Sequence, residues 1–168
     1  MSSSQVSTLE NKEMGMLKWL SLSFLVIIAD QASKFFVSSR LNLHEDIPVL
    51  PFFSITLAHN EGAAFSFLAA AGGWQRWFFT AIAVSVSAVL FFWLKRLESK
   101  EKWLACALTL ILGGAIGNLY DRVSLGYVVD FLHFYWNNWH FPAFNVADSA
   151  ITVGAIMLGW DLIKNPGK

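Results

Sequence analysis

Four long apolar stretches, each flanked by polar residues, dominate the pattern of the chain. They cover residues 19–37, 77–94, 103–120 and 141–160, and each approaches the ~20 residues that an α-helix needs to cross the hydrocarbon core of a bilayer. The eight tryptophans fall at or near the ends of these stretches, where indole rings are favoured at the membrane–water interface. The pattern predicts a membrane protein with four transmembrane helices.

Composition agrees with this prediction. Hydrophobic residues make up 55% of the chain and charged residues only 14%, which is far from the balance of a soluble globular domain. The formal net charge is zero, so nothing indicates a nucleic-acid partner. The length of 168 residues indicates one domain over residues 16–165, preceded by a polar, disordered tail over residues 1–15.

Basic residues predict the orientation. Eight of them lie on the side of the two termini and of the connection between the second and third stretches, and four lie on or towards the other side. The first group is Lys12, Lys18, Lys95, Arg96, Lys100, Lys102, Lys164 and Lys168, and the second is Lys34, Arg40, Arg76 and Arg122. Because short cytoplasmic loops carry an excess of Lys and Arg, both termini are expected in the cytoplasm.

The connection over residues 38–75 then lies outside. Its segment DIPVLPFFSITLAHN contains a partial alternation of polar and apolar residues, which indicates short β-structure at the membrane surface. The small and apolar segments that follow, EGAAFSF and AAAGGW, predict either a flexible loop, able to close as a lid over about residues 59–67, or an interfacial helix. The expected fold class is therefore an all-α membrane protein of four transmembrane helices, with a small β-rich outer segment and an outer loop.

Polar residues within the apolar stretches gather towards the outer side. Asp30, Asn118 and Asp148 lie ~16, ~22 and ~18 Å along their helices from the tryptophan at the inner end. Asp121 and Arg122 follow at the outer end of the third stretch. Ionisable residues at this depth are unfavourable, and they mark either a functional site or a buried ion pair.

Several of these residues have a purely structural explanation. Asp30 and Lys34 are spaced i,i+4, which suits an ion pair on the helix surface. For these two residues considered alone, this structural explanation is slightly favoured over a functional one. Asp121 stands beside Arg122 at a helix carboxyl end, where the Arg could neutralise terminal carbonyls and the Asp could neutralise the Arg.

The neighbouring amides and glycines also have structural uses. Asn118 and Asn145 could hydrogen-bond between helices, and Gly113 and Gly117 could allow two helices to pack closely.

Asp130 and Asp148 are harder to explain in this way. Each has apolar sequence neighbours and no basic residue within one helical turn. A carboxyl in such surroundings disfavours its charged form, and two that share a site tend to hold one proton between them. Such a pair supplies the acid and the base of an aspartyl hydrolase, although a proton relay or a structural network remains open at this point.

Other chemistries fit poorly. The four histidines fall outside the predicted helices, and the chain contains neither an HExxH zinc motif nor a GxSxG nucleophile elbow. The lone Cys106 has no histidine or charge near it in sequence that could activate it. Carboxylates remain the evident catalytic groups, and neither a metal nor a cofactor is expected.

Four motifs carry a resemblance to a known family. IADQASK, AHNEGAAFSF, GGAIGNLYDRVSLGYVVDF and FPAFNVADSAITVG resemble, in this order, the lipoprotein signal peptidases, or type II signal peptidases, of bacteria. The match runs from the first apolar stretch to the last. The resemblance implies a four-helix aspartyl endopeptidase of the bacterial cytoplasmic membrane, monomeric and surrounded by lipid, with its active site on the periplasmic side.

The implied reaction removes signal peptides from diacylglyceryl-modified prolipoproteins by cleavage before the lipidated cysteine. The resemblance makes Asp130 and Asp148 the catalytic pair. It assigns substrate-binding or supporting roles to Asp30, Lys34, Asn60, Asn118, Asp121, Arg122 and Asn145. The alternative from a different class is a small proton-coupled carrier or channel that uses intramembrane carboxylates as a relay.

Overall fold

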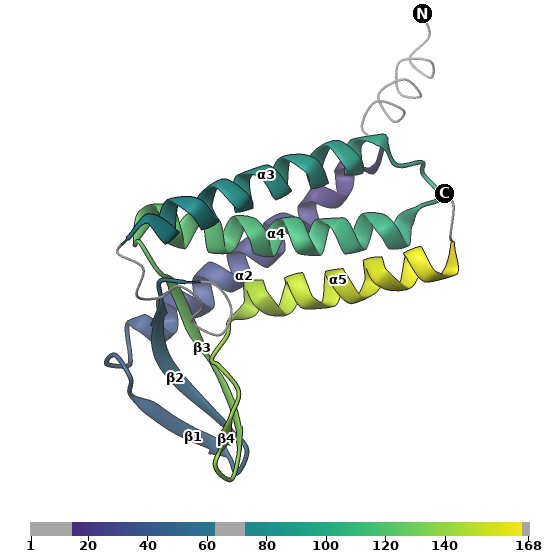
Figure 1. The fold of residues 1–168 in the computed structure, drawn as a ribbon. Coiled ribbons are helices and arrows are strands. Elements are labelled where there is room, and N and C mark those ends of the chain that lie inside the picture. Colours follow the sequence, from purple (N-terminus) through teal and green to yellow (C-terminus); the bar gives the residue numbers. More distant parts are fainter. Residues whose placement is uncertain (1–14, 63–72, 166–168) are drawn as a thin grey trace, which may run out of the picture.

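Four long helices form the body of the protein in the computed structural model, which describes residues 15–62 and 73–165 (Figure 1). They are α2 (Leu20–Ser38), α3 (Trp74–Arg96), α4 (Lys102–Ser124) and α5 (Val146–Lys164), and a short 3-10 helix, η1 (Gly15–Trp19), leads into α2. All four are long and apolar enough to cross a membrane, which confirms the predicted number of transmembrane helices. The predicted tail, apart from Gly15, and most of the predicted lid lie outside the described residues.

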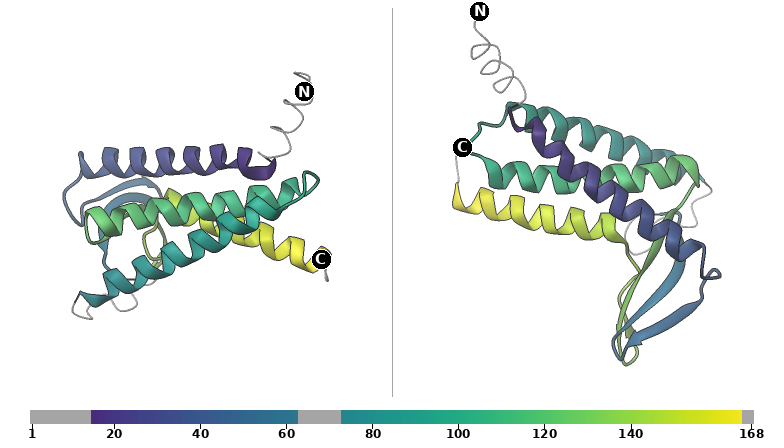
Figure 2. Two further views of the ribbon diagram at one scale, coloured as in Figure 1. Left: turned by 90° about the horizontal axis from the view of Figure 1, so that it is seen from above. Right: turned by 180° about the vertical axis from the view of Figure 1, so that it is seen from behind.

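Helix α4 is the centre of the bundle. Of its most apolar 18-residue window, 56% is buried, against 22% or less for the other three helices. It lies between α3 and α5, and α2 crosses the bundle beside it (Figures 1 and 2). The other helices expose large apolar side chains such as Phe35 and Ile163, each 76% exposed, as helices in contact with lipid are expected to do.

Glycines allow the helices to approach α4 closely. A Cβ added to Gly114 would overlap the carbonyl oxygen of Ala147 on α5, and one added to Gly113 would lie 2.8 Å from the carbonyl oxygen of Ser23 on α2. A Cβ on Gly117 would lie 2.7 Å from Asp30 Oδ2. The predicted packing role of Gly113 and Gly117 is confirmed, and Gly117 also makes room for a buried carboxylate.

An antiparallel four-stranded sheet extends from one end of the bundle, hereafter the sheet end (Figure 1). Its strands, in spatial order, are β1 (Asp46–Leu50), β2 (Phe53–Asn60), β3 (Val128–Trp136) and β4 (Trp139–His140). The first two confirm the β-structure predicted before residue 60. Strand β3 was not predicted, and it pairs with β2 so that Ala58 lies opposite Asp130.

The sheet is attached to α2 by an apolar cluster. Val129 and Phe131 of β3 and Leu57 of β2 are buried against Val37 and Leu41, at and beyond the carboxyl end of α2. This cluster fixes the position of β3, and therefore of Asp130, relative to the bundle.

The predicted start of the fourth transmembrane helix is wrong by five residues, because α5 begins at Val146 and not at residue 141. The residues before it are extended and bonded to β3: the Phe144 N–H donates to the Leu132 carbonyl at 3.0 Å, and the Leu132 N–H donates to the Phe144 carbonyl at 2.8 Å. Asn145 then caps α5 in a capping box with Asp148. Asp148 therefore lies in the first turn of α5.

Candidate active site

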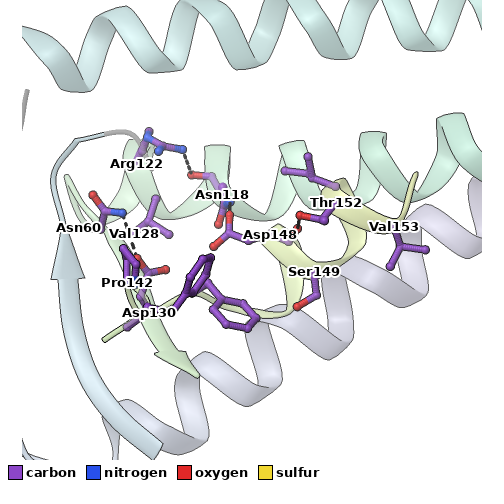
Figure 3. Close-up of a pocket in the computed structure, with 14 residues that line it drawn as sticks. Asn60, Asn118, Arg122, Val128, Asp130, Pro142, Asp148, Ser149, Thr152 and Val153 are labelled. Atoms are coloured by element: carbon purple, nitrogen blue, oxygen red, sulfur yellow. Dashed lines mark hydrogen bonds between the residues drawn. The ribbon is translucent and has the colours of Figure 1, made fainter. Parts of the chain in front are cut away.

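Asp130 and Asp148 line one pocket of about 630 Å³ at the sheet end (Figure 3). Strand β3 supplies Asp130, and the first turn of α5 supplies Asp148. The remaining wall combines polar with apolar side chains: Asn60, Asn118, Arg122, Val128, Phe141, Pro142, Ala143, Phe144, Ser149, Ile151, Thr152 and Val153. Two carboxyls that are 18 residues apart in sequence thus reach the same cavity.

Asn145 links the two carboxyls directly. Its side-chain amide donates to Asp130 Oδ1 at 2.8 Å, and its backbone N–H donates to Asp148 Oδ2 at 3.2 Å. Its side-chain oxygen accepts from the Asp148 backbone N–H at 2.9 Å. Asn145 is itself fully buried, so one helix-capping residue fixes both carboxyls relative to each other.

Two further asparagines complete the contacts of the pair. The Asn60 amide donates to Asp130 Oδ2 at 3.0 Å, and the Asn118 amide donates to Asp148 Oδ1 at 2.7 Å. Every carboxyl oxygen of Asp130 and Asp148 therefore accepts a hydrogen bond from Asn60, Asn118 or Asn145. Asn60, Asn118 and Asn145 were all candidate site residues from the sequence, and the structure brings them together.

Burial makes ionisation of Asp130 unfavourable. The residue is only 3% exposed, and removal from water together with the negative charge of Asp148 raises the pKa of Asp130 from 3.8 to about 7. Hydrogen bonds from Asn60 and Asn145 and the positive charge of Lys34 oppose this rise without cancelling it. At neutral pH, Asp130 is poised to hold or release a proton.

A second buried cluster, centred on Lys34, lies directly behind the pair. The Lys34 ammonium contacts Asp30 Oδ2 at 2.7 Å and Asp121 Oδ2 at 2.8 Å, and all three side chains are 3% exposed or less. The ammonium also donates to Asn118 Oδ1 at 3.0 Å. Because the Asn118 amide in turn donates to Asp148, the ion cluster is connected to the pocket through one side chain.

The same cluster ties three helices and β3 together. Asp30 Oδ1 accepts the backbone N–H of Ala147 in the first turn of α5 at 2.9 Å, and Asp121 Oδ2 accepts that of Val129 at 3.2 Å. Asp30, Lys34 and Asp121 do not line the pocket; they hold the segments that carry Asp130 and Asp148. The Asp30–Lys34 ion pair predicted from the i,i+4 spacing is present, but it is buried and does not lie on the helix surface as expected.

The expected pairing of Asp121 with Arg122 is wrong. Neighbouring residues on a helix point in directions about 100° apart, and Asp121 faces Lys34 and Gln31 instead. The Arg122 guanidinium turns towards the pocket, where it donates to the carbonyl of Gly62 at 3.2 Å and approaches that of Asn118 at 3.4 Å.

One supporting residue was missed from the sequence. The Gln31 amide donates to Asp121 Oδ1 at 2.9 Å, to Asp30 Oδ2 at 3.1 Å and to the Gly117 carbonyl at 3.2 Å. The sequence did contain a signal for this role, because Gln31 is a polar amide next to Asp30 within an otherwise apolar helix. Gln31 supplies donors to the two carboxylates that share the single ammonium of Lys34.

This arrangement suits acid–base chemistry at a pair of carboxyls. In residues 15–62 and 73–165, no three or more His, Cys, Asp or Glu side chains converge as metal ligands. Asp130 has a raised pKa, and the oxygens of Asp148 accept hydrogen bonds from Asn118 and Asn145. Two carboxyls that share a site can hold one proton between them, as in aspartyl hydrolases.

Comparisons with known proteins agree with this chemistry. The model of the family Signal peptidase (SPase) II matches residues 22–164. A lipoprotein signal peptidase of Pseudomonas syringae pv. tomato is 60% identical over 161 residues, covering 95% of this chain and 93% of that protein. A lipoprotein signal peptidase of Pseudomonas putida is 62% identical over 153 residues, covering 90% of each chain.

The fold is also similar to that of solved structures. A bacterial membrane enzyme determined by the in meso method superposes with a TM-score of 0.80 at 30% identity, covering 89% of this chain and 90% of that one. Together with the four membrane-spanning helices, this similarity identifies a multi-pass bacterial membrane protein. On its sequence matches and its fold, the chain belongs to the signal peptidase II family of peptidases.

Proposed function

We propose that this protein is a membrane aspartyl endopeptidase that removes signal peptides from diacylglyceryl-modified prolipoproteins, cutting before the lipidated cysteine. Relatives 60% and 62% identical are lipoprotein signal peptidases. The single observation that carries the proposal is that Asp130 and Asp148 line one pocket and are linked by Asn145. No observation favours the alternative of a proton-coupled carrier or channel.

The contacts of the two carboxyls suggest their roles. Asp148 is the base: its two oxygens accept hydrogen bonds from Asn118 and from the Asn145 backbone, and the Asn118 side chain also accepts from the Lys34 ammonium. Asp130, with its pKa of about 7, is the acid.

The reaction then needs one water molecule. Asp148 takes a proton from the water molecule, and the water oxygen attacks the scissile carbonyl carbon. Protonated Asp130 donates a hydrogen bond to the oxyanion that develops on the carbonyl oxygen. As the intermediate collapses, the proton of Asp130 passes to the amide nitrogen and the C–N bond breaks. Return of the proton from Asp148 to Asp130 restores the starting state.

The pocket wall suits the substrate. Phe141, Phe144, Ile151 and Val153 line it together with the two carboxyls, so an apolar signal helix and acyl chains can lie against it while the peptide bond reaches Asp148. The substrate enters laterally from the lipid, and the protein acts as a monomer.

The proposed orientation places the sheet end in the periplasm and both termini in the cytoplasm. The start of η1 and the end of α5 lie at the opposite end of the bundle from the sheet (Figure 1), on the side with the excess of basic residues. A reporter that is active only outside the cytoplasm, fused after Lys168, should be inactive. An active fusion would contradict this orientation.

Cleavage of a defined substrate tests the function. The purified protein in detergent is incubated with a synthetic diacylglyceryl-modified prolipopeptide, and the products are measured by mass spectrometry. We expect a single cut before the lipidated cysteine, whereas a carrier would yield no product.

The carboxyl pair is tested by amide substitution. Asp130→Asn and Asp148→Asn should each abolish cleavage while the protein stays folded, because each removes one half of the proton-transfer pair with little change in volume. Asp161→Asn is the matched control, since Asp161 lies at the other end of α5 and contacts Asn165. Substantial turnover by either of the first two variants would contradict the assignment.

A further inference from the structure

Two histidines lie together on the face of the sheet opposite the proposed active site. His133 of β3 and Asp130 are separated by an odd number of positions along the strand, so their side chains point to opposite faces. His140 follows on β4, diagonal to His133 because it pairs with Tyr135. The turn that joins the two strands lies at the part of the sheet farthest from the helices (Figure 1), where His140 is exposed and His133 is partly buried.

The two imidazole rings face each other through one nitrogen each. His133 Nε2 lies 3.2 Å from His140 Nδ1, and the ring planes differ by only 18° with centroids 5.2 Å apart. The other nitrogen of His133 contacts Asp46 Oδ1 at 3.4 Å and Ser54 Oγ at 3.2 Å. A carboxylate can only accept a hydrogen bond, so the contact with Asp46 suits the tautomer of His133 with its proton on Nδ1, in which Nε2 keeps a lone pair on the side of His140.

This cluster does not have the geometry of a serine hydrolase. Ser54 and Asp46 both contact the same nitrogen of His133, and the Ser54 hydroxyl donates to Asp46 Oδ1 at 2.6 Å. A catalytic triad needs the serine and the carboxylate on opposite nitrogens of the imidazole. The nitrogen that remains available, Nε2, faces another imidazole.

The spacing of the two nitrogens fits a shared metal ion. Two imidazole nitrogens bound to a tetrahedral ion at about 2.0–2.1 Å would lie about 3.3 Å apart, close to the 3.2 Å observed. Metal-binding histidines also commonly donate their other N–H to a carboxylate, which fixes the tautomer and the ring orientation. Asp46 is placed to accept such a hydrogen bond from Nδ1 of His133, 3.4 Å away.

We propose that His133 Nε2 and His140 Nδ1 bind a divalent transition-metal ion of the class that prefers imidazole, such as Cu²⁺, Ni²⁺ or Zn²⁺, with Asp46 orienting His133. Binding through Nδ1 requires the neutral tautomer of His140 that carries its proton on Nε2, so a proton on Nδ1 moves to Nε2 and is not lost from the ring. Because no third His, Cys, Asp or Glu ligand converges there within residues 15–62 and 73–165, water completes the coordination. The site was not predicted from the sequence, because neither histidine belongs to a metal-binding motif.

The position of the site connects it to the proposed active site. His140 directly precedes the segment Phe141–Phe144, which lines the pocket and bonds to β3 through Phe141 and Phe144. A metal ion shared by His133 and His140 would hold β4 on β3 just before this segment. The site is therefore separate from the carboxyl pair but borders the same pocket wall.

Titration of purified protein tests the proposal. The protein, without a histidine tag and stripped of metal with a chelator, is titrated in detergent with Cu²⁺, Ni²⁺ and Zn²⁺ by calorimetry. We expect one ion per chain, with Cu²⁺ bound most tightly and no binding of Mg²⁺ or Ca²⁺. Absence of binding, or equal binding of Mg²⁺, would overturn the proposal.

Variants locate the ion. His133→Gln and His140→Gln should each weaken Cu²⁺ binding at least tenfold, and Asp46→Asn should weaken it about 10- to 100-fold through the loss of its contact with His133. His44→Asn is the matched control: His44 lies in the same outer segment, and its φ of 65° is tolerated by Asn. Binding that survives both glutamine substitutions would place the ion elsewhere and refute the site.

A measurement on the unaltered protein does not depend on whether these variants fold. The electron paramagnetic resonance spectrum of the Cu²⁺-loaded protein should show coupling to two imidazole nitrogens. Coupling to one nitrogen, or to none, would contradict joint ligation by His133 and His140.

Discussion

Replacing Asp130 with Asn should stabilise the protein at pH 8 and have much less effect at pH 5. The Asp130 carboxyl is 3% exposed, and its pKa is raised from 3.8 to about 7 by burial and by the charge of Asp148. The folded protein therefore binds this proton more tightly than the unfolded chain does. The resulting stabilisation is complete below pH 3.8 and is lost as the pH rises towards 7. The amide of Asn carries no charge and shows no such loss.

The size of the effect follows from the two pKa values. Between pH 5 and pH 8, the unaltered protein loses stability over about two pH units, from pH 5 to the folded-state pKa near 7. At ~1.4 kcal/mol per unit, this amounts to roughly 3 kcal/mol in the free energy of unfolding. For a chain of this size, 1 kcal/mol shifts Tm by roughly 2–4 °C. The Tm advantage of Asp130→Asn should therefore be ~6–12 °C larger at pH 8 than at pH 5.

Thermal unfolding in one detergent, followed by tryptophan fluorescence at both pH values, measures this difference. Asp121→Asn is the matched control, because Asp121 is equally buried but pairs with Lys34 at 2.8 Å. Its substitution removes one partner of a buried ion pair and should lower Tm at both pH values.

The pH dependence is the decisive result. If the Tm difference between Asp130→Asn and the unaltered protein is the same at pH 5 and pH 8, Asp130 does not titrate between these values. Its assignment as the acid of the pair would then lose its physical basis.

Three further outcomes are expected. Lys34→Met should lower the free energy of unfolding by about 3–5 kcal/mol, because it leaves two buried carboxylates without their ammonium. Denaturant titration measures this change, and an unchanged midpoint of the unfolding curve would contradict it. Asp121→Asn should retain some cleavage of the lipidated peptide while Asp130→Asn retains none, and the reverse order would make Asp121 the catalytic partner. Gly114→Leu should lower Tm by separating α4 from α5, whereas Gly159→Ala, with no atom within 4 Å of the added Cβ, should not.

Much of the bundle could be predicted from local pattern. The length and hydropathy of each helix are properties of one continuous segment, as is the i,i+4 spacing that pairs Asp30 with Lys34. The four helices and this ion pair were therefore evident before the fold was known. The pairing of Asp121 with Lys34 was not evident, because Lys34 lies on α2, far away in sequence.

The elements that form the pocket depend on distant partners. Strand β3 exists because Val129 and Phe131 pack against α2 and because its backbone pairs with β2. The same pairing draws Phe144 into an extended conformation and delays the start of α5 to Val146. Hydropathy cannot distinguish such apolar extended residues from the first turn of a membrane helix. The sequence supplies candidate residues, whereas the structure supplies the contacts that join them.

The spacing of Asp30 and Lys34 also bears on how the chain enters the membrane. Helix α2 reaches the bilayer before α4 and α5 have been synthesised, when neither Asp121 nor the Ala147 N–H is available to it. A single charged residue disfavours insertion by about 2.5–3.5 kcal/mol at the centre of a helix. Because the Asp30 carboxylate and the Lys34 ammonium lie 2.7 Å apart on one helix, the first span can enter as a neutral unit without help from the rest of the chain. Arrival of α4 then adds Asp121 to an ion pair that is already formed, so biogenesis and final architecture use the same contact.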